Sequence, residues 1–197
     1  MRILTVAAAA AAAASAVAFA APASAQVDGA RVEAIVGYES ATLDDFGSRD
    51  DVSESGAVYG LGLGYDVPLG RSVAVGVDLE ATESSVRWHE ASNLFSTDLA
   101  TELGRDLYAG ARLTVAATPG VNLYAKAGYT SLRARTDFTS PTFSEVRETT
   151  DGGVRAGAGA QFALGGSGAY IGAEYRISSY DAELTRHQGV AALGFRF

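Results

Sequence analysis

Few residues of this 197-residue chain combine side chains that could catalyse a reaction. The chain contains two histidines, His89 and His187, and no cysteine. His89 stands beside Glu90 and three residues before Ser92, so a hydroxyl, a base and a carboxylate occur together, as nucleophilic catalysis requires. This segment is expected to be a loop, however, and His187 is followed by no nearby serine. We therefore assign no catalytic residue.

Clustered carboxylates form a second pattern with possible chemistry. Calcium takes six to eight oxygen ligands, so a run of acidic side chains could bind it. The spacing here is not that of an EF-hand, and a solvated acidic loop is the ordinary interpretation. Divalent cations bridging this loop to lipid phosphates remain an alternative, and no metal ligand is assigned. The cluster consists of Asp44, Asp45, Asp50, Asp51 and Glu54.

Two glycine-rich runs, Gly60–Gly64 and Gly157–Gly159, could suggest a nucleotide site. Neither is expected to open a helix, and neither carries the lysine of a phosphate-binding loop. Glycines inside a strand instead mark places where facing groups come close. We therefore predict strands at both runs and expect no cofactor.

The first 25 residues differ in kind from the rest. Arg2 precedes an alanine-rich apolar run, and Pro22-Ala23-Ser24-Ala25 supplies the small residues of a cleavage site. This is the pattern of a secretory signal peptide, although an N-terminal anchor helix is an alternative. We expect residues 1–25 to be a signal peptide and residues 26–197 to form one domain. No apolar run in that domain is long enough for a membrane helix.

Apolar residues alternate with small or charged ones through most of the domain. Between Val73 and Thr82, for example, every second residue is apolar, and Asp78 and Glu80 lie between them. A strand with one apolar and one polar face is typical of a lipid-facing barrel wall around a polar interior. The pattern predicts eight strands, at residues 31–39, 57–66, 73–82, 106–115, 121–129, 154–162, 169–177 and 188–197. Four apolar residues fall on the inner faces: Ile35, Val58, Leu132 and Val190.

The connections between these strands alternate in length. Residues 67–71, 117–120 and 164–168 have the composition of tight turns. Residues 40–54, 82–105, 133–153 and 180–187 are longer, polar and expected to be loops. Short turns at one end and long loops at the other describe an up-and-down outer-membrane barrel whose short turns face the periplasm. The fold class is therefore all-β, an eight-stranded antiparallel transmembrane barrel.

Charged residues divide by region. The chain carries 15 basic and 23 acidic residues, an acidic balance that argues against nucleic acid as a partner. The four expected loops together carry a net charge of −8, whereas the inner faces carry six basic and six acidic residues. A balanced interior is required because an unpaired buried ion is costly. The inward set is Arg31, Arg112, Lys126, Arg155, Arg176 and Arg196 with Glu33, Asp66, Asp78, Glu80, Asp106 and Glu174.

Aromatic residues near the expected strand ends fit the interfacial girdles of a membrane protein. They are Tyr38, Tyr59, Tyr65, Tyr129, Tyr175, Phe195 and Phe197. The main alternative, a soluble β-sandwich or lipocalin-like barrel, also alternates. Its core would need large apolar residues, whereas the faces opposite the apolar ones here carry glycine and ions.

The end of the chain, Gly189–Phe197, has apolar residues at alternate positions before a terminal phenylalanine. With residues 31–38 and 58–65, it resembles the opacity/OmpA-like small outer-membrane barrels, often labelled "porin family". The resemblance implies an outer-membrane location, contact with lipid and lipopolysaccharide, recognition of Phe197 by the barrel assembly machinery, and a monomer. Members are commonly envelope structural proteins, adhesins or surface antigens, and a few related folds are enzymes.

Three functions stay open on these grounds. An eight-stranded barrel is just wide enough to be filled by side chains, so twelve inward ions and three inward tyrosines predict a plugged lumen. We therefore expect a non-enzymatic structural or surface-interaction protein whose acidic loops could meet a surface partner. The alternatives are a narrow channel for small solutes and a lipid-modifying enzyme, although the Ser–His spacing of lipid A deacylases is not matched. The inward tyrosines are Tyr108, Tyr124 and Tyr170.

Overall fold

A computed structural model describes residues 28–43, 52–92, 97–140, 143–181 and 184–197, and the expected signal peptide lies outside them. Within these ranges the chain forms no helix whose length and hydropathy would let it cross a lipid bilayer. The described residues form nine strands, which are β1 (Gly29–Leu43), β2 (Val52–Pro68), β3 (Val73–Ser84), β4 (Arg87–Ser92), β5 (Thr97–Thr118), β6 (Val121–Ser140), β7 (Phe143–Ala163), β8 (Ala169–Tyr180) and β9 (Leu184–Arg196).

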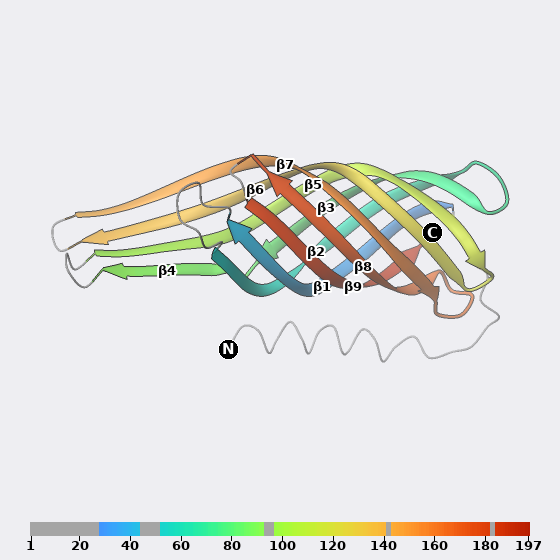
Figure 1. Ribbon diagram of the computed structural model, residues 1–197. Coiled ribbons are helices and arrows are strands. Elements are labelled where there is room, and N and C mark those ends of the chain that lie inside the picture. The colour runs from blue at the N-terminus through green and yellow to red at the C-terminus, as the bar shows by residue number, and fades with distance from the viewer. Residues whose placement is uncertain (1–27, 44–51, 93–96, 141–142, 182–183) are drawn as a thin grey trace.

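The sheet closes on itself as a ring of eight antiparallel strands (Figure 1). Consecutive strands pair around the ring, and β9 returns to pair with β1 from Arg31↔Arg196 to Leu43↔Leu184. β3 pairs with β5 and thereby leaves β4 outside the ring. β4 continues beyond the end of β3 and pairs with the far part of β5. The prediction of an eight-stranded up-and-down barrel is confirmed.

The period-two pattern sorts side chains to the two faces of the barrel wall as expected. On β3, Val77 and Leu79 point outward and are more than half exposed, at 60% and 56%, while Asp78 and Glu80 are buried inside. Exposed apolar side chains of this kind would be unfavourable in water and are favourable in lipid. The inward Ile35, Val58 and Val190 form a small apolar cluster of their own.

Tight turns close one end of the barrel. In the β2–β3 turn, the amide of Leu69 donates to the carbonyl of Val73 at 2.8 Å. In the β7–β8 turn, Gly165 and Gly168 have φ of 78° and 87°, a conformation that side-chain-bearing residues rarely adopt. The C-terminus lies at this end as well, where the amide of Phe197 donates to the carbonyl of Ala30 at 2.9 Å.

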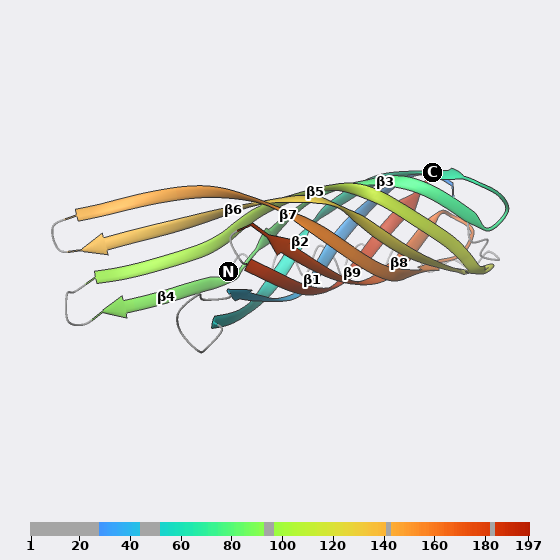
Figure 2. The same cartoon turned by 45° about the horizontal axis from the view of Figure 1, so that its top comes forward.

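The opposite end corrects the prediction of long loops. β5, β6 and β7 are 22, 20 and 21 residues long, whereas about 9–11 residues suffice to cross a bilayer. Most of the expected loops 82–105 and 133–153 are therefore strand. Together with β4, the far parts of these strands (residues 97–105, 131–140 and 143–152) form a four-stranded sheet that extends away from the barrel (Figures 1 and 2). We call it the projecting sheet.

The projecting sheet was missed because its alternation is weaker than that of the barrel wall. On β6, one side carries Leu132, Ala134 and Thr136 and the other side carries Arg133 and Arg135, but on β7 charged residues lie on both sides. Cross-strand pairs stabilise such strands instead, as where Arg87 lies opposite Glu102 and Glu102 opposite Arg135. The other two expected loops also shrink, since β1 reaches Leu43, β2 begins at Val52 and β9 begins at Leu184.

Candidate functional site

The barrel interior contains charged side chains in successive layers. Near the tight turns, the guanidinium of Arg31 pairs with the carboxylates of Asp66 and Asp78. Arg196 adds a second cation 3.2 Å from Asp66. These groups are almost fully buried, so they neutralise one another without help from bulk water.

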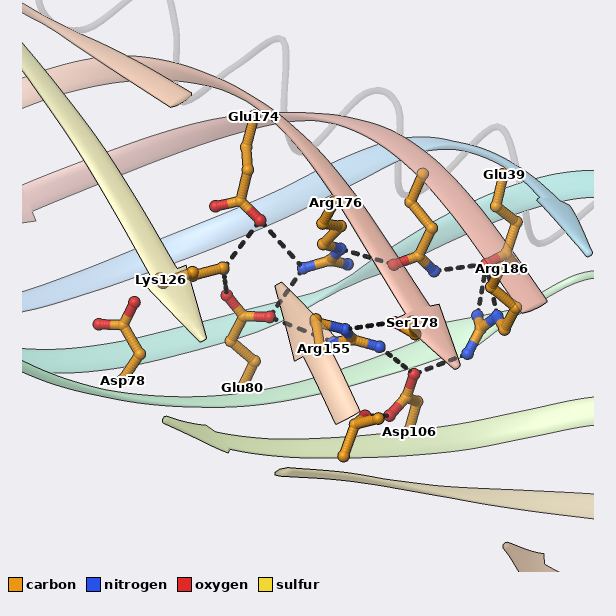
Figure 3. Close-up of polar contacts among 12 residues, drawn as sticks. Glu39, Asp78, Glu80, Asp106, Lys126, Arg155, Glu174, Arg176, Ser178 and Arg186 are labelled. Atoms are coloured by element: carbon orange, nitrogen blue, oxygen red, sulfur yellow. Dashed lines mark hydrogen bonds and ion pairs between the residues drawn. The ribbon is translucent and has the colours of Figure 1, made fainter. Parts of the chain in front are cut away.

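The middle layer is centred on Glu80. Its two carboxylate oxygens accept from Lys126 and, at 2.7 Å, from Arg176 (Figure 3). Lys126 also lies 2.8 Å from Glu174, whose other oxygen accepts from the hydroxyl of Tyr124 at 2.8 Å. One carboxylate thus joins side chains from β3, β6 and β8 across the lumen.

The layer farthest from the tight turns contains a pair that the sequence analysis did not count. Arg186 was expected in a loop, but it lies on β9 with its side chain fully buried and paired with Glu39 (Figure 3). Its guanidinium also donates to Asp106 at 2.6 Å. Asp106 accepts further from Arg155 and, at 2.7 Å, from the hydroxyl of Tyr180.

This pair corrects the charge count and keeps its balance. Adding Glu39 and Arg186 to the predicted six and six gives seven acidic and seven basic inward residues in the described part of the chain. The signal was present in the sequence, since Arg186, Gln188 and Val190 continue one face of β9. The predicted inward tyrosines are also confirmed, because Tyr108, Tyr124 and Tyr170 are buried.

An apolar layer lies above the ions, at the base of the projecting sheet. It includes Leu132, which the sequence analysis placed on an inner face without a reason. Trp88 and Ala134 pack against it from the sheet. Along the described part of the lumen, the buried ions are therefore followed by this cap. The buried members of the cap are Ala41, Val86, Leu103, Leu132, Tyr180 and Leu184.

The strand glycines make room for the lumen side chains. A Cβ at Gly64 would collide with the guanidinium of Arg31, and one at Gly159 would lie 2.7 Å from the hydroxyl oxygen of Tyr124. The expectation that the glycine runs are strand positions crowded by facing side chains is confirmed. They line the interior rather than a nucleotide site.

The candidate catalytic and metal-binding residues lie on several different strands or outside the described ranges. His89 and Ser92 lie on β4, a strand where a loop was expected. His187 faces outward, with Nδ1 2.7 Å from the hydroxyl of Tyr175. Glu54 is exposed on β2, and the other acidic residues of its cluster lie outside the described ranges. Within those ranges, no three metal-ligating side chains come together.

The outward face of the projecting sheet carries mixed charge. Arg87 pairs with Glu102 at 3.2 Å, and Arg133 pairs with Glu148 at 3.5 Å. A groove of about 330 Å³ lies over this face at the point where the register of β5 and β6 shifts. Its charged lining residues are Glu83, Glu102, Arg105, Arg133, Arg135 and Glu148, with no excess of either sign.

The projecting sheet also has an uncovered edge. β6 pairs with β7 along its whole length, but β8 pairs with β7 only from Gly153 to Ala163. Residues 143–150 of β7 are exposed at every position. Among the described residues, none pairs with the outer edge of residues 144–150.

A closed eight-stranded ring with an apolar outer face and an ion-filled interior defines a small outer-membrane barrel. Residues 9–197 match the family model for the outer membrane protein beta-barrel domain, so the chain belongs to that family. It is therefore a protein of the Gram-negative outer membrane. A comparison with curated protein sequences found no significant match.

Solved structures share the fold at low identity. Ail, the attachment invasion locus protein of Yersinia pestis, has been solved with the heparin analogue sucrose octasulfate. It is 19% identical with a TM-score of 0.53, and the alignment covers 86% of this chain and 99% of that one. The Neisserial surface protein A is 16% identical with a TM-score of 0.56, covering 85% and 97%.

Proposed function

We propose that this barrel is a non-enzymatic surface-interaction protein that is closed to solutes and presents the projecting sheet to protein partners outside the cell. The observation that carries the proposal is the contrast between the two halves of the molecule. Seven acidic and seven basic side chains and an apolar cap occupy the lumen, while β5, β6 and β7 continue outward far past the length that a bilayer needs.

The filled lumen argues against the channel alternative. A conducting pore needs a continuous water path, whereas the cap places Leu132 and Val86, both fully buried, across the lumen. Planar-bilayer recording with the purified barrel is expected to show no porin-sized conductance steps. Regular open steps in the wild-type protein would instead support the channel.

The charge of the projecting sheet favours a protein partner over a sulfated glycan. Ail was solved with a heparin analogue, but the charged side chains described on the projecting sheet are five acidic and five basic. A polyanion needs a basic surface, which this sheet does not offer. The charged residues are Glu102, Asp137, Glu145, Glu148 and Asp151 with Arg87, Arg105, Arg133, Arg135 and Arg147.

The proposal includes the partners of the membrane-embedded part. Lipid and lipopolysaccharide surround the apolar outer face, and the barrel assembly machinery recognises Phe197, whose side chain is 65% exposed. The barrel is a monomer within its own membrane. No nucleic-acid, metal or cofactor role is included.

A shortened variant tests the role of the sheet. Replacing residues 90–99 and 136–147 each by Asn-Gly removes the tips but keeps the paired rows His89↔Ala100 and Arg135↔Glu148 below them. Retained heat-dependent gel migration would show that its barrel still folds. Vesicles carrying either protein are then applied to glass coated with serum proteins, with heparin, or with a bilayer containing the wild-type barrel.

Wild-type vesicles are expected to adhere to the serum-protein coat, the barrel-containing bilayer or both, and shortened-variant vesicles to adhere to neither. Adhesion to heparin alone would contradict the choice of a protein partner. Equal adhesion of the two vesicle types, with both barrels folded, would exclude the projecting sheet as the interaction surface.

A further inference from the structure

The uncovered edge of β7 presents backbone hydrogen-bonding groups over a long stretch. Among the described residues, the stretch from Ser144 to Asp151 pairs only with β6, and its register with β6 has no shift. No proline interrupts the stretch. Proteins usually cover or break such edges, because a straight unpaired edge adds another strand readily. An edge of this kind is suited to β-strand addition.

Its side chains suit a copy of the same strand. Two copies of one edge strand can join into a regular antiparallel sheet only if a two-fold axis normal to the sheet relates them. One residue of the strand then lies opposite the same residue of the other copy. Centring the pair on Glu145 or Arg147 would oppose like charges, which destabilises cross-strand pairs. If the pair is centred on Val146, Glu145 of each copy lies opposite Arg147 of the other. Among registers confined to the fully exposed residues 143–150, this one alone opposes unlike charges.

The remaining pairs of this register are compatible. Ser144 lies opposite Glu148, so the five residues from Ser144 to Glu148 of each strand pair without a charge conflict. The second acidic residue of the stretch therefore meets a hydroxyl. The edge is self-complementary in both shape and charge.

The direction of the strands decides where the second copy must be. The projecting sheet continues the barrel strands and extends away from the barrel end (Figure 2). Two barrels in one membrane, related by an axis along the membrane normal, would direct both β7 strands the same way. Antiparallel pairing therefore requires the second barrel to be inverted, which places it in a facing membrane.

The reach of the sheet fits this arrangement. Tyr129 lies among the outward aromatic residues, and β6 continues for eleven residues beyond it to Ser140. At about 3.3 Å per residue, these extend roughly 35 Å from the aromatic level. The paired stretch of β7 lies near the tip, so the two barrels stay well apart.

We infer that the β7 edge binds the β7 edge of a second copy in an apposed outer membrane, joining two projecting sheets into one eight-stranded sheet centred on Val146. The inference rests on the proposed surface-interaction function and names its partner. Such pairing holds two membranes together without any other component.

Vesicle clustering with charge-reversed variants tests both the partner and the register. Phosphatidylcholine vesicles with two dyes, each carrying the full-length barrel, are mixed and scored for two-colour clusters. Wild-type vesicles are expected to cluster with each other and not with protein-free vesicles. E145R or R147E alone opposes like charges in both pairs, so each should cluster with itself roughly tenfold less.

Mixing the two single variants restores both ion pairs, because each edge then carries the charge that the other lacks. E145R vesicles should therefore cluster with R147E vesicles at close to the wild-type level, and the double variant E145R/R147E should again cluster with itself. R105E is the matched control, since Arg105 is also exposed but lies on β5, between β3 and β6 and away from β7. Its clustering should be unchanged.

Three outcomes would overturn the inference. Single variants that cluster as well as wild type exclude this edge, and failure of the mixed variants to cluster excludes the register. Wild-type clustering with protein-free vesicles shows a lipid contact instead. If the edge variants behave as wild type while the shortened sheet loses adhesion to the serum-protein coat, the inference fails and the proposed function stands.

Discussion

Inside this barrel, a single side chain can neutralise groups from several strands. Arg186 on β9 pairs with Glu39 on β1 and donates to Asp106 on β5, and all three are buried. Its position on an inner face follows from the alternation of β9. The start of the strand was placed too late, because the outward residues Thr185, His187 and Gly189 do not extend the apolar outer face of β9.

Replacing Arg186 with alanine should be strongly destabilising, because it leaves Glu39 buried without its cation. Breaking a buried pair from one side costs about 3–5 kcal/mol. Unfolding by urea in lipid vesicles measures this loss. The control is R133A, whose ion pair with Glu148 is about half exposed and is expected to contribute at most about 1 kcal/mol. Equal losses for the two variants would contradict the buried network.

At the level of strands, the sequence predicted those parts that face lipid and missed those that do not. Val73 to Ala81 alternates cleanly, so β3 was placed to within a few residues. Residues 143–150 of β7 are exposed on both faces, and their charges and threonines look like a loop. Their strand conformation depends on pairing with β6, which is a tertiary contact that no local pattern encodes.

The cap that joins barrel and projecting sheet offers a direct probe. Leu132 is fully buried in it, and truncation to alanine should cost about 2–5 kcal/mol through lost burial and the cavity left behind. Trp88, the one tryptophan of the chain, packs against the same cap, so its emission should move to longer wavelength. L61A, at an outward position, should leave the emission unchanged. An unshifted spectrum in L132A would argue against the cap.

For the whole molecule, the family and the general fold followed from the sequence because three independent patterns agreed. The alternation of apolar and polar residues predicted the barrel wall, and the alternating lengths of the connections predicted its two ends. The balance of inward charges predicted an interior occupied by ionic side chains. The candidate function was harder, since it depends on an unpaired edge. A strand has a free edge when no other strand pairs with it on one side, and this depends on the tertiary arrangement, which the sequence pattern does not show.

The position of the membrane can be tested with arginine substitutions along the outer face. Leu79 lies midway along β3, and L79R should destabilise the barrel by about 2–4 kcal/mol. Val67 lies beside the tight turn after β2, where the same substitution should cost only about 0–1 kcal/mol. Urea titration in vesicles compares the two. A larger loss for V67R would place the bilayer elsewhere.

The pairing of β9 with β1 also determines when the barrel can form. Glu39 on β1 and Arg186 on β9 are separated by 147 positions, so the carboxylate of Glu39 gains this cation only when the last strand pairs with the first. Contacts this distant in sequence slow folding and leave intermediates prone to aggregation. Until β9 is available, the ring cannot close, and the apolar and charged faces of the other strands lack their full set of partners. Closure of the barrel is therefore an all-or-none event.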